Sequence, residues 1–520
     1  MSAALSHCII LPEILDIVCL YLSRSELACL ARTCSFFFNP AIRQLWSSGP
    51  VEDKNILNLL PNSLVFHYGE KENETKFEVN IPTNVPSDYF DRLNIYAPYV
   101  RHMNVSLAWS HDEEYYHHRH LPGWRTVACH ARKHVLLPNL RRVELMERYS
   151  TTTSSRPCSD WLSILIPPSL RDLDLFRNFV DDSPGCIERY LDLMDSVFNR
   201  CSNHLERLRI YTIEPSISQL TAQSPNDPAS RTLVPGALVS RALKHVVRMP
   251  QLRELQMPEL SPHLEIPDLP KTSTCRLNSL RMSCGSIEPL FRLWQTPIPA
   301  HLTQLTLSTI WPSNTTAVTE MHELASLIAA QSPDITKLHF YFDEIPDTQH
   351  LMDVLYPLHK LHLTELIVNG IQLTQPPQRI SLRKVAEYWP LLEVLEIKHA
   401  GTTFNELITV SSYLPRLNCL LLQLESVIPS EIISGDAIPQ PDTRPTQELE
   451  LVSDFRCVHK FNPVEADAFA KFLTKIWRSL NIKCYCRGYK HGPEYEEFKV
   501  TLAQHLNGSP PSIPPIDIVA

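Results

Sequence analysis

Apolar residues return along most of the chain in the order apolar-x-x-apolar-x-apolar. The pattern is most regular from Leu252 to Leu417, where successive starts lie 25 to 33 residues apart. This spacing is close to the roughly 20 to 29 residues of leucine-rich repeats. The alternating pair predicts a short strand whose apolar side chains face the inside of a solenoid, and helical patterns lie between strands, as in 321–330 and 382–388. The twelve motifs are Val100-Met103-Val105, Leu140-Val143-Leu145, Leu170-Leu173-Leu175, Leu205-Leu208-Ile210, Leu252-Leu255-Met257, Leu277-Leu280-Met282, Leu302-Leu305-Leu307, Ile335-Leu338-Phe340, Leu363-Leu366-Val368, Leu392-Leu395-Ile397, Leu417-Leu420-Leu422 and the shorter Leu449-Leu451.

Residues 11–46 show a different pattern, with the spacing of amphipathic helices. Two helices are predicted there, because the apolar positions recur every three or four residues. Ser23 and Glu26 form a capping-box pattern at the start of the second helix. Asn39-Pro40 predicts the start of a third short helix. A unit this small is marginal alone and usually needs a partner surface.

The sequence of this segment resembles the F-box in the form common in fungal F-box proteins. The resemblance rests on LPEIL, Leu22, the capped ELACLARTC and the closing Leu45-Trp46. F-boxes dock on the Skp adaptor of cullin-RING ubiquitin ligases through an apolar helical face. The resemblance therefore implies contact with the Skp adaptor and, through it, with a cullin. It assigns adaptor binding to Leu11, Pro12, Ile14, Leu15, Val18, Leu22, Leu27, Leu30 and Cys34.

The expected fold class is α/β, with an N-terminal three-helix F-box followed by a leucine-rich-repeat solenoid of short parallel strands alternating with helices. Segments rich in polar residues and proline interrupt the repeats and predict loops. The expected domains are the F-box at 1–50, a connector to the solenoid at 51–98, irregular repeats at 99–455 with insertions near 111–124, 216–236 and 429–446, a C-terminal cap at 456–506 and a disordered, proline-rich tail at 507–520. Within the cap, a helix is expected over 463–480 and a strand over 482–487.

Composition narrows the classes of function. The net charge of −9 disfavours a nucleic-acid binder that works by neutralising phosphates. No apolar run is long enough for a membrane-spanning helix, so no membrane partner is expected. The start lacks a secretory signal, so the fourteen cysteines are interpreted as reduced thiols of a soluble protein in the cytoplasm, the nucleus or both.

Catalytic patterns are scarce. With twelve glycines the chain has no glycine-rich phosphate loop and no Gly-x-Ser-x-Gly elbow. The cluster from His111 to His120 has residue types that bind metals but lacks a His-Glu-x-x-His spacing, so a solvated loop is the preferred interpretation. Cys484-x-Cys486 fits alternation along a strand better than a zinc knuckle. We expect no cofactor, no metal and no catalysis.

The residues that flank the strand leucines point outward and give a candidate surface for a protein substrate of unknown identity. Arginines beside aromatic residues are typical of binding hot spots, whereas the later repeats carry mainly glutamates. The predicted substrate-binding residues are Arg142, Phe176, Arg207, Arg209, Tyr211 and Arg281.

The sequence thus predicts the substrate-recruiting, non-catalytic subunit of a Skp–cullin–F-box ubiquitin ligase. Two alternatives stay open: a scaffold that binds the Skp adaptor without directing ubiquitination, and an enzyme with a site in the insertions.

Overall fold

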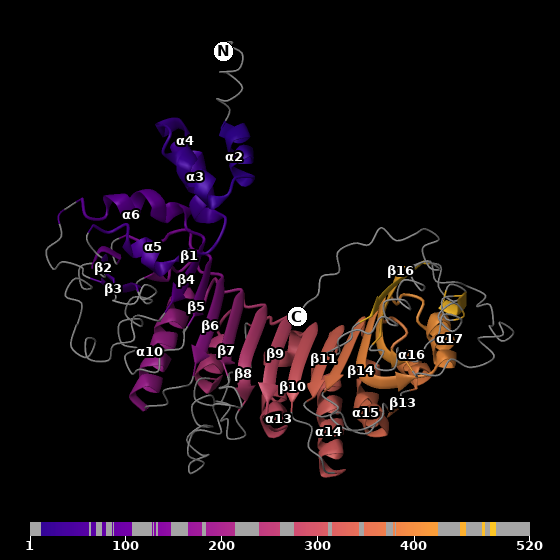
Figure 1. Ribbon diagram of the computed structural model, residues 1–520. Coiled ribbons are helices and arrows are strands. Elements are labelled where there is room, and N and C mark those ends of the chain that lie inside the picture. The colour runs from indigo at the N-terminus through magenta and orange to yellow at the C-terminus, as the bar shows by residue number, and fades with distance from the viewer. Residues whose placement is uncertain are drawn as a thin grey trace. The chain divides into compact units, whose positions relative to one another are not determined.

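The computed structural model is an α/β protein in which parallel strands alternate with helices (Figure 1). It divides into two compact units, residues 1–277 and 278–520, called unit 1 and unit 2 below. The structure describes residues 12–61, 64–68, 75–79, 86, 88–106, 127, 129–131, 134–146, 165–178, 184–213, 239–260, 275–309, 315–342, 348–370, 378–379, 381–424, 448–453, 468, 471–473 and 479–484. The predicted insertions and the tail lie outside these residues.

Unit 1 begins with three helices around a small core of their own. Cys19, Leu27 and Ala41 form this core, and Leu22, Leu30, Ala31 and Leu45 pack against it. The predicted capping box is confirmed, since the Glu26 amide donates to Ser23 Oγ and the Ser23 amide donates to Glu26 Oε2. The helices are α2 (Pro12–Leu20), α3 (Arg24–Ala31) and α4 (Ser35–Ser47).

The predicted start of the third helix at Asn39-Pro40 is wrong, because α4 begins four residues earlier and contains Pro40. Proline at this position removes one amide and leaves the carbonyl of Phe36 without its helical partner. Phe36 lies in the first turn, where its side chain is 42% exposed. The contacts of α4 with α2 and α3 bury Ala41 and Ile42, which offsets the cost of the proline.

The segment predicted as a connector also supplies part of the fold. Val51 pairs with Met103 in the parallel sheet, and Ile56, Leu57 and Leu60 are buried behind it. The elements of this segment are β1 (Val51–Glu52), α5 (Asp53–Leu57), the antiparallel pair β2 (Leu64–Tyr68) and β3 (Thr75–Val79), α6 (Asp91–Tyr96) and the 3-10 helix η1 (Ala97–Tyr99).

Beyond this segment, unit 1 continues as a row of parallel strands in the order β1-β4-β5-β6-β7-β8. The predicted motifs lie in register, for instance Val143 beside Leu173 and Leu173 beside Leu208. The described elements are β4 (His102–Ser106), β5 (Arg142–Met146), β6 (Asp172–Asn178), α10 (Pro184–Cys201), β7 (Arg207–Ile213) and β8 (Glu254–Leu260).

Unit 2 repeats the arrangement with the strand order β9-β10-β11-β12-β14-β15-β16-β17. The helical prediction for 382–388 is confirmed, and that for 321–330 lies within α14. The elements are β9 (Ser279–Cys284), α13 (Glu288–Trp294), η2 (Ile298–His301), β10 (Gln304–Thr309), α14 (Thr315–Gln331), β11 (Lys337–Phe342), α15 (Thr348–Leu355), η3 (Tyr356–Lys360), β12 (Glu365–Gly370), β13 (Gln378–Arg379, beside β14), α16 (Leu382–Tyr388), β14 (Val394–Thr402), α17 (Phe404–Tyr413), β15 (Cys419–Leu424), β16 (Glu448–Ser453) and β17 (Ser479–Cys484).

The last strand extends the sheet where a cap was predicted. Strand β17 pairs with β16 in parallel and begins at Ser479, three residues before the predicted Ile482. Ser479 and Leu480 were expected at the end of a helix. The pairing of Leu480 with Leu449 shows that tertiary register overrides the local helical pattern there.

Backbone hydrogen bonds connect neighbouring repeats. In many repeats, one carbonyl just before the strand accepts the amides of two successive residues in the next repeat. Arg101 O, for example, accepts from Arg141 and Arg142, and Thr303 O accepts from Thr336 and Lys337. The geometry depends on backbone groups, so it tolerates the variable side chains of this chain.

Candidate protein-binding surfaces

The first surface is the outer face of α2. Ile14, Ile17, Val18 and Tyr21 are 40%, 54%, 44% and 85% exposed. Ile14, Ile17 and Val18 lie on α2, and Tyr21 directly follows its last residue, Leu20. Because they are three or four residues apart, the four side chains form one stripe. Leu15 and Cys19 lie on another side of the helix and are buried, and Cys19 belongs to the core of the three helices. This apolar stripe of α2 is unusual for a surface helix, because large exposed apolar side chains are normally scattered.

The structure divides the predicted adaptor-binding residues between this surface and the core. Ile14, Val18 and Cys34 are exposed, and Leu22 and Leu30 are half-buried. Leu15 and Leu27 are buried, so their side chains hold the helices together and are not available for direct contact. Leu11 and the side chain of Pro12 lie outside the described part of the chain. Sequence reasoning missed Ile17 and Tyr21, although both continue the spacing set by Ile14 and Val18.

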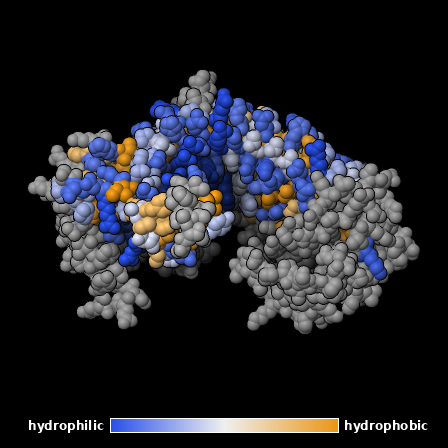
Figure 2. All heavy atoms as spheres, turned by 90° about the horizontal axis from the view of Figure 1, so that it is seen from above, coloured by the Kyte–Doolittle hydropathy of each residue, from blue (hydrophilic) through white to orange (hydrophobic). Residues whose placement is uncertain are grey.

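Hydrophobic residues also appear in patches among the hydrophilic ones on the face seen in Figure 2.

Aromatic contacts connect α4 with the following part of unit 1. Tyr96 of α6 packs against Phe38 and Trp46 of α4, with ring centroids 6.2 and 5.2 Å apart. These contacts use the side of α4, so the apolar stripe of α2 is not involved.

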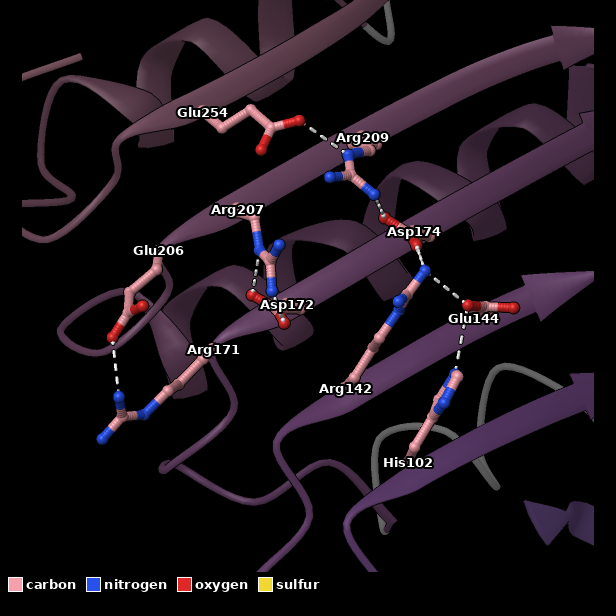
Figure 3. Close-up of polar contacts among 10 residues, drawn as sticks. All are labelled: His102, Arg142, Glu144, Arg171, Asp172, Asp174, Glu206, Arg207, Arg209 and Glu254. Carbon is pink, nitrogen blue, oxygen red and sulfur yellow. Dashed lines mark hydrogen bonds and ion pairs between the residues drawn. The ribbon is translucent and has the colours of Figure 1, made fainter. Parts of the chain in front are cut away.

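The second surface is the outward side of strands β4 to β8 in unit 1, where charged side chains link neighbouring repeats (Figure 3). Arg142 Nη2 lies 2.9 Å from Asp174 Oδ2 and 2.6 Å from Glu144 Oε1. Arg209 Nε donates to Glu254 Oε1 at 2.8 Å, and its Nη1 lies 3.7 Å from Asp174. We call this set the charge ladder: His102, Arg142, Glu144, Asp172, Asp174, Arg207, Arg209 and Glu254.

Guanidinium groups are the more accessible part of the charge ladder. The side chains of Arg142 and Arg207 are 36% and 45% exposed, whereas those of Asp172 and Asp174 are 13% and 3% exposed. Arg207 is held by two donors, since Nε and Nη2 reach the two oxygens of Asp172 at 2.7 and 2.5 Å. The carboxylates thus orient the arginines, and a planar guanidinium keeps donors free beyond one bidentate pair.

Burial shapes the protonation of the charge ladder. It raises the pKa of Asp174, although Arg142 and Arg209 act in the opposite direction. Burial also lowers the pKa of His102, and Glu144 only partly offsets this. Hydrogen bonding to Asp172 raises the pKa of Arg207 further above its ordinary value. Arg207 therefore keeps its charge, while His102 favours its neutral form.

Among the predicted substrate-binding residues, the structure brings Arg142, Arg207 and Arg209 together on this surface. Tyr211 lies on β7 beside them and is half-buried. Phe176 lies on β6, but its side chain is outside the described part. Arg281 is exposed on β9 of unit 2 and belongs to a different unit.

Sequence reasoning placed Asp174 on the outward face but assigned no role to the carboxylates between the arginines. The signal was present in the residue that precedes the first leucine of each strand. In successive repeats this position holds Arg142, Asp172, Arg207 and Glu254, whose charges alternate in sign. Parallel strands in register place such residues side by side, so alternating charges predict ion pairs between repeats.

One arrangement in unit 2 resembles a nucleophile, a base and an orienting carboxylate. His339 Nε2 lies 2.8 Å from Glu365 Oε1, and its Nδ1 lies 3.4 Å from Thr306 Oγ1. Acyl transfer also needs free donors for an oxyanion. Strand β11 pairs with β10 on one side and β12 on the other, which uses its backbone amides in the sheet. These residues therefore form polar contacts between neighbouring strands. Lys337 takes part in them, since its Nζ lies 2.9 Å from Glu365 Oε2.

Within the described ranges, no group of three or more histidine, cysteine or acidic side chains is arranged to hold a metal ion. The His111 to His120 cluster lies outside them. Over the same ranges no helix has the length and apolarity needed to cross a membrane.

Comparison with protein-family models found no match, and no curated protein matches the sequence. Among solved structures, the leucine-rich repeat-containing protein LegL7 from Legionella pneumophila is similar, with a TM-score of 0.30 and 11% identity over 71% of this chain and 91% of that protein.

Proposed function

We propose that this protein recruits a substrate to a Skp–cullin–F-box ubiquitin ligase, with the three N-terminal helices binding the Skp adaptor and the strand face of unit 1 binding the substrate. The observation that carries the proposal is the apolar stripe of α2. Three large side chains of one face of α2 and Tyr21, just after its end, are 40% to 85% exposed, while the same helix has a separate, buried face. Such a face is suited to pack against a partner helix.

Because residues 11–46 resemble an F-box, we assign the Skp adaptor as the partner of the apolar stripe of α2. Of the residues assigned to adaptor binding, Ile14 and Val18 lie in the stripe, and Ile17 and Tyr21 are added to it. Leu27 packs with Cys19 and Ala41 and so supports the site indirectly by holding α2 against α3 and α4. Burying a side chain of this size contributes roughly 1.5 to 3 kcal/mol, so two or three of them make a substantial contact.

The charge ladder supports the binding of a substrate that carries carboxylate or phosphate groups. Its arginines are accessible and held in fixed orientations, which lowers the entropy lost on binding. Oriented guanidiniums bind carboxylates and phosphates bidentately. The resident carboxylates reduce the net positive potential, so geometry rather than bulk charge would select the substrate.

In this proposal the protein acts by holding its substrate close to the ubiquitin ligase. The F-box holds the adaptor and cullin while the strand face holds the substrate, so ubiquitin transfer becomes effectively intramolecular. The protein contributes no chemistry in this proposal.

The adaptor role is tested by copurification of the Skp adaptor with full-length variants. Ile17→Asp with Tyr21→Asp should abolish copurification, because two charges enter the apolar contact while the core of the helices is untouched. Lys54→Asp, in the exposed part of α5, is the matched charge control and should copurify normally. Normal copurification of the double variant would refute the adaptor site.

The ligase role is tested separately by recovery of cullin and by ubiquitination of captured proteins. Arg207→Ala with Arg209→Ala should strip substrates from the complex and leave adaptor binding intact. If adaptor and substrates are both recovered but cullin and ubiquitination are not, the protein is a Skp-binding scaffold.

A further inference from the structure

A row of arginines runs along unit 1 at the residue that directly precedes each of the strands β4 to β8. Successive repeats hold Arg101, Arg141, Arg171, Glu206 and Arg253 at this position, and we call these five residues the arginine row. The four arginines are exposed. The backbone amide of each member donates to the carbonyl of the member before it, at 2.7 to 2.9 Å. Neighbouring parallel strands are about 4.8 Å apart, so the row is about 19 Å long.

Unit 2 shows that the fold does not require arginine at this position. Its first four repeats have the neutral residues Asn278, Thr303, Thr336 and Thr364 there. Each threonine hydroxyl donates to the carbonyl of the preceding member, at 3.2 to 3.3 Å. These side chains therefore connect repeats within unit 2, which is a structural role.

The arginines of the row have no comparable structural role. Within the part of the chain that the structure describes, the side chains of Arg101, Arg141 and Arg253 make no hydrogen bond or ion pair. Arg171 lies 3.0 Å from Glu206, and the two side chains are 51% and 39% exposed (Figure 3). Like charges side by side on neighbouring strands destabilise a sheet. The adjacent arginines therefore do not stabilise the fold, and unneutralised positive charge of this kind attracts an acidic partner.

The arginine row also provides what the charge ladder lacks. In the charge ladder, Arg142, Arg207 and Arg209 are already paired with carboxylates. The arginine row lies one residue earlier in the same repeats and carries guanidinium groups without such partners. An acidic segment that meets this side of unit 1 therefore finds uncompensated positive charge at the arginine row.

We propose that the arginine row binds an extended segment of aspartate and glutamate residues that crosses the repeats, and, resting on the proposed function, that this segment belongs to the substrate. An extended chain advances about 3.3 Å per residue, so about six residues span the row. Each carboxylate can accept two hydrogen bonds from one guanidinium. A nucleic-acid strand fits less well, because the net charge of −9 opposes binding driven by phosphate neutralisation.

The test measures how a fluorescein-labelled octaglutamate peptide binds the full-length protein, by fluorescence anisotropy at low ionic strength. One exposed ion pair contributes little, so two arginines are changed together. Arg101→Gln with Arg141→Gln should weaken binding about tenfold. The matched control is Arg24→Gln with Arg32→Gln, which removes the same charge from exposed arginines at the two ends of α3 and should bind as the wild type does.

Thermal unfolding separates a binding role of the arginine row from a structural one. Because Arg101→Gln with Arg141→Gln removes like charges from neighbouring strands, its unfolding midpoint should equal or exceed that of the wild type. Weaker binding together with a lower midpoint would overturn the proposal. Equal binding by this variant and the control would overturn it as well, and so would tighter binding of a thymidine oligonucleotide of the same charge.

The assay contains no adaptor, so its outcome is independent of the adaptor and ligase roles. If Arg207→Ala with Arg209→Ala loses octaglutamate while the arginine-row variant keeps it, the charge ladder alone binds the acidic segment. That result rejects the role of the arginine row and leaves the proposed function intact. If the arginine-row variant alone loses octaglutamate and the wild type does not bind the Skp adaptor, the row is supported and the proposed function fails.

Discussion

Asp174 is the residue on which two neighbouring arginines of the charge ladder converge. Its side chain is 3% exposed and lies near both Arg142 and Arg209. Because burial raises its pKa, folding favours the protonated carboxyl, so the part of stability due to this group is present at low pH and lost as pH rises through the folded-state pKa. Ionisation of Asp174 therefore lowers the stability of the folded state, whereas its oxygen stabilises the fold as the acceptor of the hydrogen bond from Arg142.

Replacing Asp174 by asparagine or by alanine should therefore change the free energy of unfolding by different amounts. Asp174→Asn keeps an acceptor for Arg142 and should change the free energy of unfolding by less than about 1 kcal/mol. Asp174→Ala removes the acceptor of the hydrogen bond from Arg142 and should cost about 1.5 to 3 kcal/mol, as for hydrogen bonds to charged groups. Denaturant unfolding of both variants measures the difference, and equal losses would contradict a buried, hydrogen-bonded carboxyl.

His102 gives a prediction for pH. An unfolded histidine takes up a proton near pH 6.5, whereas burial makes the folded His102 do so at lower pH. Between these values the unfolded state binds more protons, so stability falls as pH falls. The unfolding free energy of the wild type should therefore drop relative to His102→Gln between about pH 7.5 and 5.5. A relative gain would mean that the ion pair with Glu144 outweighs burial.

At the scale of single elements, strand register decides which side chains hold a repeat. Leu305 is completely buried in β10 and lies beside Leu280 and Leu338 of the neighbouring strands. Leu305→Ala should lower the free energy of unfolding by about 2 to 5 kcal/mol. Thr306 is on the opposite side of the strand, and Thr306→Ala should cost about 1 kcal/mol or less.

Thermal unfolding of the two variants checks this register. Thr306 is nonetheless only 7% exposed and contacts His339, so its substitution is not expected to be silent. A larger loss for Thr306→Ala than for Leu305→Ala would contradict the orientation of β10.

The elements that sequence reasoning predicted well are those whose residues repeat. Each strand carries alternating apolar residues, and proline or a turn before it stops the preceding helix, so the strands could be placed from pattern alone. Helix α4 and strand β17 were placed less well, because Pro40 and Leu480 follow tertiary packing rather than local preference. The charge ladder required comparison between repeats, since ion pairs across strands join residues about 30 positions apart in sequence.

At the scale of the whole molecule, two parts of the chain present surfaces of different character. The apolar stripe of α2 has the character of a helix-binding surface, and the charge ladder has that of a polar surface with oriented donors. Neither surface depends on the other for its side-chain contacts. Variants of the one should therefore leave the function of the other unchanged.

The most direct test of the central proposal is a titration of purified Skp adaptor with the full-length protein and with Ile17→Asp/Tyr21→Asp, followed by isothermal calorimetry. The wild type should bind with one-to-one stoichiometry, and the variant should bind at least about a hundredfold more weakly, as expected for losing two apolar contacts of roughly 1.5 to 3 kcal/mol each. Arg207→Ala/Arg209→Ala should match the wild type. If the wild type does not bind the adaptor, or if the α2 variant binds it equally well, the apolar stripe of α2 is not an adaptor site.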